Sequence, residues 1–253
     1  CRRMMAIKPA TIEKLAEQLA ALGLKPGDVV MTHASMRRLG PVEGGASGLI
    51  EAQLKAVGPA GTLLMVLGAA EGAPFDPLTT PVDIKDMGVL AEAFRTFPGV
   101  TVSDHPADRF GAIGKDADAL LEPTPLHDYH GPGSPLERFT QMGGRVLRLG
   151  ADPDTVTLTH YAEYLAVIPD KVRVRRRYVC ADRGEVFIES LDDNEGVAAW
   201  PHGDYFSRIF LDYKSAGRLS QGVVGECVGE LFDARDFVDF AVQWMNRELG
   251  EKR

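Results

Sequence analysis

The sequence has few cysteines, and they stand far apart. Cys1, Cys180 and Cys227 are the only three, and none belongs to a CxxC pair. Neither a disulfide framework nor a thiolate zinc site is therefore indicated. This cysteine usage favours a reducing cytoplasm as the location of the protein.

Long hydrophobic runs are missing as well. No segment approaches the roughly 18 consecutive apolar residues that a membrane-spanning helix needs; the best candidate is TLLMVLGAA at 62–70. The N-terminal segment meets lysine and proline before any apolar stretch long enough for a signal peptide. We therefore expect a cytoplasmic protein with no membrane partner.

Basic charge is also in short supply. The 253 residues include 36 acidic and 28 basic side chains, which gives a net charge of -8. A surface of this sign repels phosphate backbones and attracts cations, so we expect no nucleic-acid partner. The one basic segment, KVRVRRRYV at 171–179, alternates charges with valines, as the solvent face of a strand does.

Several common enzyme signatures are absent. Neither the dinucleotide pattern GxGxxG nor the phosphate loop GxxxxGK occurs, and GGASGL at 44–49 misses the hydrolase pattern GxSxG by one residue. The zinc motif HExxH is missing, and HxxE alone supplies one ligand fewer than a catalytic zinc site uses. We therefore expect no metal cofactor.

Hydrophobic periodicity predicts a mixed α/β fold. An amphipathic helix at 12–22 precedes a buried strand at 28–34, a second helix at 44–57 and an apolar strand at 62–68. This βαβ succession predicts a central, largely parallel sheet flanked by helices. From residue 171 the pattern changes to period two, which indicates additional antiparallel strands in the C-terminal half. We expect one domain over 1–253, with the α/β part in 1–170 and antiparallel strands and C-terminal helices in 171–253.

The loop after the first predicted strand is rich in hydrogen-bonding groups. The segment MTHASMRRLG, 31–40, follows a strand end, where ligands collect in parallel α/β proteins. Ser35, Arg37 and Arg38, with the glycines before the next helix, would suit phosphate groups. A polar surface loop explains the same residues.

A histidine and a glutamate stand three positions apart in the otherwise apolar segment TLTHYAEYLA, 157–166. On a helix, His160 and Glu163 share one face. A carboxylate bonded to one ring nitrogen fixes the tautomer and raises the basicity of the other nitrogen, as in a general base. The alternative is a buried polar pair kept for packing.

Two further polar residues have competing interpretations. Pro106 forces His105 into an extended conformation, where its imidazole could donate to a ligand or simply complete a turn. Ser134 precedes Pro135 at the start of a predicted helix, and capping alone explains it.

Carboxylates gather around Trp200 in the segment LDDNEGVAAWPHGDYF, 191–206; they are Asp192, Asp193, Glu195 and Asp204. Carboxylates beside an aromatic ring suit a polyamine, through charge-assisted hydrogen bonds and stacking. A solvated turn between strands explains the same residues.

Taken together and in order, these segments resemble the aminoglycoside 3-N-acetyltransferase family, also called the antibiotic N-acetyltransferase family, which differs in fold from the GNAT acetyltransferases. The resemblance rests on segments spread over nearly the whole chain: THASMRRLG, GGASGLIEAQLKAVGPAGTLLM, PFDP, DMGVLAEAF, HPADRFGAIG, GSPLERF, VLRLG, LTHYAEYLA, WPHGDYF and LFDARDFVDFAVQWM. It implies a mixed α/β enzyme that moves the acetyl group of acetyl-CoA to the 3-amino group of a 2-deoxystreptamine antibiotic, and so confers resistance.

The resemblance also implies roles for individual residues. Those expected to face the coenzyme, line its pantetheine channel or border it are Thr32, His33, Ser35, Arg37, His105, Phe110 and Ser134. His160 would act as the base and Glu163 as its orienting acid in a direct transfer, and Thr157 is a candidate for stabilising the oxyanion. The carboxylates expected to receive the cationic sugars are Asp192, Asp193, Glu195 and Asp204.

Two departures from the family pattern concern the acceptor. After the second strand the chain reads VLGAAEGAPFDP, where members often have proline and small polar or aromatic residues, so Glu71 is expected to be an altered substrate contact. Before the histidine it reads DTVTLTH, where asparagine and serine are frequent. The alternatives are an acetyltransferase for another small amine, a catalytically silent binding protein, and thiol catalysis through Cys180 or Cys227. Either a monomer or a homodimer is compatible with the sequence.

Overall fold

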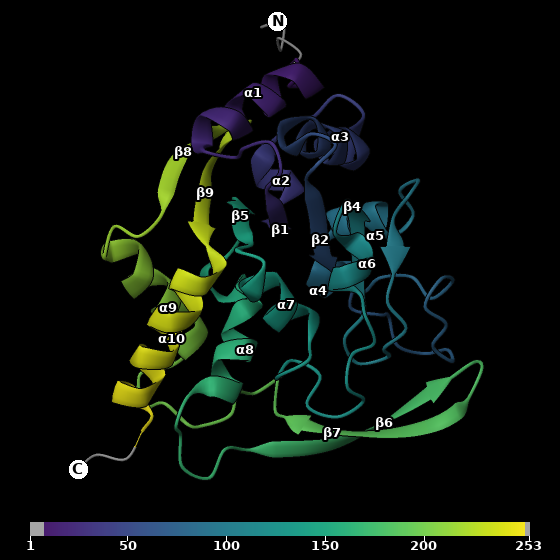
Figure 1. The fold of residues 1–253 in the computed structure, drawn as a ribbon, viewed down its shortest axis with the longest axis vertical. Coiled ribbons are helices and arrows are strands. Elements are labelled where there is room, and N and C mark those ends of the chain that lie inside the picture. Colours follow the sequence, from purple (N-terminus) through teal and green to yellow (C-terminus); the bar gives the residue numbers. More distant parts are fainter. Residues whose placement is uncertain (1–7, 251–253) are drawn as a thin grey trace, which may run out of the picture.

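The structure, a computed structural model of the chain, describes residues 8–250; Cys1 lies outside the described residues. Seven strands form the main sheet in the order β3-β4-β2-β1-β5-β9-β8 (Figure 1). Their bounds are β1 (Val29–Ala34), β2 (Thr62–Val66), β3 (Thr101–Val102), β4 (Phe110–Gly114), β5 (Arg145–Leu149), β8 (Ser220–Val224) and β9 (Cys227–Asp233).

The sheet has a parallel centre and antiparallel margins. Strand β1 pairs in parallel with β2 and β5, whereas β4 and β9 run antiparallel to their neighbours on both sides. Strands β8 and β9 join through a tight turn in which Gly225 has φ +57°, and such short connections require antiparallel strands. The predicted mixed α/β class, with a parallel centre and additional antiparallel strands, is confirmed.

Side chains of alternate residues on the central strands pack into two hydrophobic cores, one on each face of the sheet. Val30 packs in the core formed with α1 (Ile12–Leu22), α3 (Gly45–Val57) and α5 (Val89–Arg95). Val29 and Met31 pack in the opposite core, formed with α6 (Ala117–Leu120), α7 (Pro135–Gln141), α8 (Leu158–Leu165), α9 (Tyr205–Ser215) and α10 (Ala234–Glu248). Helix α8, which carries His160, is therefore fixed by its packing in this core, chiefly against α10 and α7.

Helix boundaries follow the capping residues of the sequence. The Thr11 side chain accepts a hydrogen bond from the Lys14 N–H at the start of α1, and Gly23 ends this helix with φ +120°. The short helices α2 (Met36–Leu39) and α4 (Ile84–Met87) begin at Ser35 and Asp83 in the same way. These side chains satisfy backbone donors that a first helical turn leaves open.

Strands β6 (Arg173–Cys180) and β7 (Gly184–Leu191) form a separate two-stranded antiparallel sheet, which is drawn at the bottom of Figure 1. Its residues alternate in exposure along β6, as the period-two pattern predicts. The N–H of Leu191, at the end of β7, donates to the Tyr164 hydroxyl at 3.0 Å. This bond ties the hairpin to α8 and brings the acidic segment after β7 beside His160.

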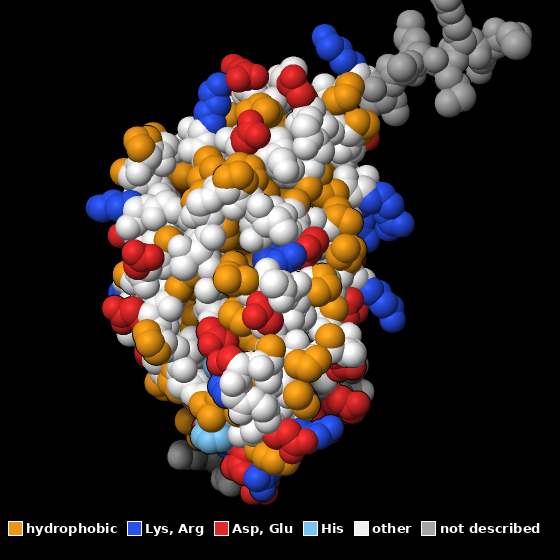
Figure 2. Space-filling view, turned by 90° about the vertical axis from the view of Figure 1, so that its right-hand side faces the viewer, with side chains coloured by type: hydrophobic (Ala, Val, Ile, Leu, Met, Phe, Trp, Pro, Cys, Tyr) orange, Lys and Arg blue, Asp and Glu red, His pale blue; other side chains and the backbone are white. Residues whose placement is uncertain are grey.

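The face of the molecule drawn in Figure 2 offers little to single out a site. On the face drawn in Figure 2, acidic and basic side chains are scattered among hydrophobic and uncharged atoms. No helix within residues 8–250 is both long and apolar enough to cross a membrane.

Candidate active site

Two cavities adjoin near the C-terminal ends of β1 and β2, where ligands collect in parallel α/β sheets. The strand-end cavity, of about 490 Å³, is lined by the end of β1, the end of β2, parts of α4 and α5, and most of the segment 151–157. The acidic cavity, of about 510 Å³, is lined by residues 193–196, 198–200 and 203–206. Asp154, His160 and Phe206 line both cavities.

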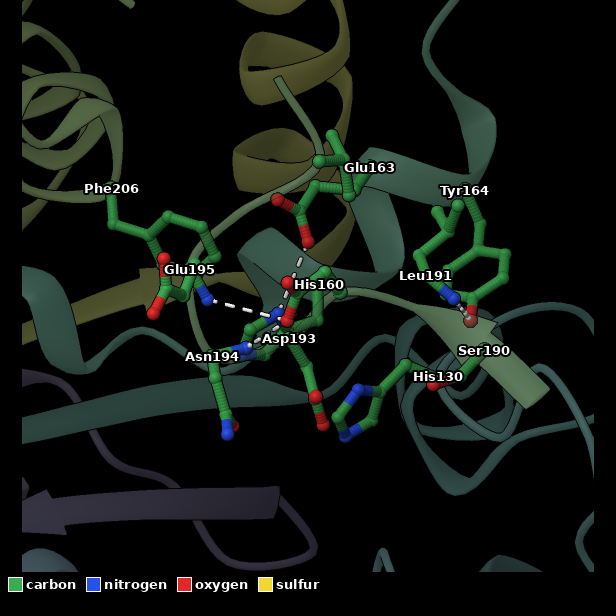
Figure 3. A network of polar contacts seen from close by, with 12 residues as sticks. His130, His160, Glu163, Tyr164, Ser190, Leu191, Asp193, Asn194, Glu195 and Phe206 are labelled. Carbon is green, nitrogen blue, oxygen red and sulfur yellow. Dashed lines mark hydrogen bonds and ion pairs between the residues drawn. The ribbon is translucent and has the colours of Figure 1, made fainter. Parts of the chain in front are cut away.

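His160 and Glu163 form a hydrogen-bonded pair on α8. The His160 Nδ1 lies 3.1 Å from Glu163 Oε2 (Figure 3). The other oxygen of Glu163 accepts from the Tyr205 hydroxyl, which in turn accepts from the Val197 N–H at 2.9 Å. A carboxylate can only accept, so Nδ1 carries a proton, and in the neutral imidazole Nε2 is then left with a free lone pair. This is the tautomer that a general base needs.

The burial of this pair is uneven. The Glu163 side chain is 1% exposed, whereas the His160 side chain is 18% exposed. Glu163 therefore acts from within the core, and the imidazole reaches both cavities. Thr157, immediately before the first residue of α8, lines the strand-end cavity beside it.

Three of the predicted acidic residues line the acidic cavity: Asp193, Glu195 and Asp204. Asp193 accepts from the Tyr129 hydroxyl at 2.6 Å and pairs with Arg176. Burial alone would raise the pKa of the Asp193 carboxyl, but His130 and the other surrounding donors and cations outweigh it and lower this pKa. Asp193 is therefore ionised at neutral pH.

The remaining acidic residues differ in how much of their hydrogen-bonding capacity is free. Asp204 caps α9 by accepting from the N–H groups of Phe206 and Ser207. Asp192 lies outside both cavities and accepts from Arg176 at 2.8 Å and from two backbone N–H groups of its own turn. Within residues 8–250, no side-chain hydrogen bond or ion pair engages the carboxylates of Glu195 and Asp154. These two are the freest acceptors for a cation.

Thr32, His33 and Ser35 line the strand-end cavity, as their position after β1 predicts. Thr32 donates its hydroxyl proton to Gln53, and Ser35 caps α2. Arg37 is exposed and lies outside the cavity lining, while Arg38 bonds the Gly150 carbonyl at 2.7 Å. The two arginines therefore have different surroundings, and Arg38 supports the loop that forms the cavity wall.

The other predicted contacts are not brought to either cavity. Phe110 and Ser134 are fully buried, and Ser134 caps α7 by accepting from the Glu137 N–H. His105 is 4% exposed; its Nδ1 accepts from the Asp108 N–H and its Nε2 lies 3.2 Å from the Leu126 carbonyl. Glu71 is exposed in a turn outside both cavity linings. For Ser134 and His105, the simpler interpretations as cap and turn residue account for their contacts.

Local sequence patterns did not identify several residues of the site. Tyr205 orients Glu163, His130 stacks on His160, and Asp154 lines both cavities. His130 and Tyr205 lie about 30 and 45 positions from the histidine, so no short spacing joins them to it, whereas Asp154 lies in the DTVTLTH segment directly before it. No group of three or more potential metal-ligating His, Cys, Asp or Glu residues occurs among residues 8–250.

His33 predicts a measurable pH dependence of stability. Burial, assisted by Arg148, lowers the pKa of the His33 imidazole to about 3, and its Nε2 is buried with no partner among the described residues. In the unfolded chain this imidazole binds a proton with a pKa of about 6.5, whereas in the folded chain it stays neutral at that pH. The free energy of unfolding should therefore fall by roughly 1 kcal/mol for each pH unit below about 6.5. Urea unfolding of the parent and of His33→Asn between about pH 7 and about pH 4 measures the difference. Parallel stability curves would contradict the assignment.

The chain that forms these two cavities can be compared with known proteins. A sequence model described as aminoglycoside 3-N-acetyltransferase matches residues 31–246, which is most of the chain. The chain belongs to the aminoglycoside 3-N-acetyltransferase family. The match includes most of β1, all of α8 and the acidic segment after β7. All residues that line the strand-end cavity and the acidic cavity therefore lie in the matched part of the chain.

Relatives of known sequence and structure support this membership over nearly the full length. Aminoglycoside N(3)-acetyltransferase VII of Streptomyces paromomycinus is 38% identical over 273 residues, covering 97% of this chain and 94% of the relative. AAC-IIIb, solved as a binary complex with CoASH, superposes with a TM-score of 0.90 at 35% identity, over 97% of this chain and 100% of that chain. AAC-VIa bound to sisomicin gives a TM-score of 0.90 at 33% identity, over 96% and 100%.

Membership in the aminoglycoside 3-N-acetyltransferase family confirms the predicted enzyme class, so the chain is an acetyltransferase. The predicted cosubstrate, acetyl-CoA, agrees with the coenzyme complex of AAC-IIIb. The fold that the resemblance implied is also confirmed, since the superpositions cover 97% and 96% of this chain with a TM-score of 0.90.

Proposed function

We propose that the protein transfers the acetyl group of acetyl-CoA directly to the 3-amino group of a 2-deoxystreptamine aminoglycoside, with His160 as the general base. The observation that carries the proposal is the position of His160 between two cavities, with its Nδ1 held by Glu163. Two substrates that bind in separate cavities can meet only where those cavities join. The base is located at that junction.

The strand-end cavity suits the thioester arm of the coenzyme. Its wall combines apolar side chains, such as Met65 and Leu90, with the hydroxyls of Ser35 and Thr157. A pantetheine chain likewise alternates methylene and amide groups, so it matches a cavity of mixed polarity. In this arrangement Ser35 and the neighbouring strand end hold the arm, and the thioester points towards His160.

The acidic cavity suits a polyamine. Asp154 and Glu195 offer carboxylates with no competing partner among the described residues, and Asp193 adds a third charge next to His160. Trp200 supplies an aromatic surface in the same wall. Ammonium groups gain charge-assisted hydrogen bonds from such carboxylates. The net charge of -8 attracts the same cations over longer distances.

The chemistry follows from the tautomer of His160. Nε2 accepts a proton from the amine as the amine nitrogen attacks the thioester carbonyl, and Glu163 stabilises the resulting imidazolium. The C–S bond then breaks, and the proton on Nε2 passes to the departing thiolate. Thr157, at the edge of the same cavity, is placed to donate a hydrogen bond to the developing oxyanion.

Catalysis by a thiol has less support. Cys180 is buried, Cys227 is half-buried, and neither lines the strand-end or the acidic cavity. Burial raises the pKa of both thiols, which disfavours the reactive thiolate. A transfer that passes through no acyl-cysteine is the simpler mechanism.

The function can be tested by following the release of free thiol from acetyl-CoA across a panel of amines. Gentamicin-type and neomycin-type antibiotics should be turned over with a higher kcat/KM than simple diamines. Equal turnover of simple amines would favour the alternative of another small-amine acceptor. Absence of thiol release with every acceptor would favour the silent binding protein.

The acidic cavity predicts that the KM for the aminoglycoside rises with salt. Exposed charge pairs are screened over about 8 Å at physiological ionic strength, and Glu195 and Asp154 are exposed. Steady-state kinetics across a roughly tenfold range of NaCl concentration, centred near physiological ionic strength, measure the effect. The doubly neutralised variant Asp154→Asn with Glu195→Gln should have a higher KM at low salt and a weaker salt response. A parent KM that does not change with salt contradicts the proposal.

A further inference from the structure

The ring of His160 does not stand alone in the cleft. The imidazoles of His130 and His160, both labelled in Figure 3, are stacked with nearly parallel planes, inclined by 9°, and with centroids 4.8 Å apart. Phe206 packs against His160 with centroids 4.8 Å apart, at a tilt of 58°. His160 is therefore held between an aromatic ring and a second titratable ring.

His130 is itself rigidly held. It is 7% exposed, its Nε2 lies 3.1 Å from Asp108 Oδ1, and the Tyr129 ring packs edge-on against it with centroids 4.7 Å apart. Asp108 is 2% exposed, and its second side-chain oxygen is buried with no partner among the described residues. The hydrogen bond to His130 is thus the one side-chain bond that this buried carboxylate makes within residues 8–250.

Several charged groups face the two imidazoles. On α8 itself there is Glu163, and Lys171 lies beyond it; the surrounding loops contribute Asp108, His105, Asp154 and Asp193, with Arg176 behind Asp193. The acidic cavity adds Glu195 and Asp204, which caps α9. The residues of α9 itself that reach this point are the uncharged rings of Tyr205 and Phe206. Carboxylates therefore dominate the immediate surroundings of His160.

This setting creates a conflict for a general base. Carboxylates that attract a polyamine also favour a proton on the imidazole among them, and a protonated imidazole cannot accept a proton. A cation in contact with the ring opposes this effect. Burial disfavours the charged form of His130, but Asp108 outweighs it, with help from Asp193 and Glu163, so the pKa of His130 is raised above its usual value. His130 is therefore charged in mildly acidic solution.

We propose that His130, anchored by Asp108, is a positioning residue that fixes the plane of the His160 ring and, through its positive charge, keeps His160 unprotonated. The role in turnover rests on the proposed function of His160 as the base. The electrostatic coupling between the two rings is independent of that function, since it needs only the stacked geometry.

The test replaces the charge but keeps an aromatic ring. In His130→Phe, the acid limb of the pH profile of kcat/KM should move to higher pH by about one unit, because a unit charge at this distance is worth roughly 1 kcal/mol or more. The kcat at high pH should stay near the parent value. His127→Phe is the matched control, since this exposed imidazole belongs to the same loop and lies outside both cavities.

Titration of the histidine ¹⁵N resonances follows the same coupling without any substrate. The midpoint of His160 should rise in His130→Phe, and rise less in Asp108→Asn, which weakens the cation without removing it. An unchanged or lower midpoint in a folded variant overturns the proposal. The parent protein provides a test that does not depend on either variant folding. If His130 is neutral at the pH where His160 titrates, the proposal is overturned. Failure of the proposed acetyl transfer would instead appear as absent turnover with the shift in the His160 midpoint intact.

Discussion

Replacing His160 with alanine is expected to lower kcat by roughly 10²- to 10⁴-fold, the usual contribution of a general base. The affinity for coenzyme A should stay near normal, because the strand-end cavity keeps all its other lining residues. Steady-state kinetics give the change in kcat, and calorimetric titration of coenzyme A gives the affinity.

A matched control separates loss of the base from loss of structure. Thr155→Ala changes another residue of the strand-end cavity wall, whose hydroxyl bonds only the local Asp152 carbonyl, and it should reduce kcat far less. Thr155→Ala should unfold near the parent temperature. His160→Ala should stay folded but lose about 1–3 kcal/mol of stability, because the buried Glu163 carboxylate loses one of its partners. Full activity of His160→Ala would remove His160 from the mechanism.

Replacing Glu163 with glutamine is expected to lower kcat by about 10²-fold or more, although the side chain keeps its shape. A carboxylate can only accept a hydrogen bond from Nδ1, whereas an amide NH₂ can donate to it. Tyr205 will continue to donate to the amide oxygen, which turns the NH₂ group towards His160. The ring proton then moves to Nε2, where it blocks the lone pair that must accept the proton of the amine.

Tyr205→Phe is the matched control for this tautomer effect. It removes the donor to Glu163 and the acceptor for the Val197 N–H, but leaves the contact between Glu163 and His160. Its main cost should be stability, by about 1–3 kcal/mol, because buried polar groups lose their partner. A kcat in Glu163→Gln equal to that of the parent, or a larger kcat loss in Tyr205→Phe, would contradict the assigned tautomer.

The fold was predictable where hydrophobic periodicity is strong. The helix at 12–22 and the strands at 28–34 and 62–68 appear as α1, β1 and β2, because each buries one apolar face or both. The proportion of antiparallel strand pairing in the main sheet was harder to predict from the sequence. It depends on how β4 and β9 return to the sheet, and connections of this kind leave little trace in the periodicity of single strands.

The pair His160 and Glu163 could be predicted because both residues lie on one helix at a spacing that defines their contact. The contacts of His130 and Tyr205 could not, since they reach α8 from a loop and from another helix. A resemblance to a family predicts which positions match its functional residues, but it does not predict how exposed those side chains are. This explains why Phe110 and Ser134, expected at the coenzyme, are enclosed in the core.

The wall of the acidic cavity has a consequence for how the enzyme can diversify. Residues 193–200 connect β7 to the turn before α9, outside the seven-stranded sheet, and Asn194, Glu195 and Ala199 are exposed. Val197 of this connection packs in a hydrophobic core, but substitutions at the three exposed positions disturb little of either core, so they carry a small penalty in stability. The pair His160 and Glu163, by contrast, lies on a helix packed in the hydrophobic core against α10 and α7. Selection can therefore remodel the range of acceptors at this connection while the acetylation chemistry is inherited unchanged.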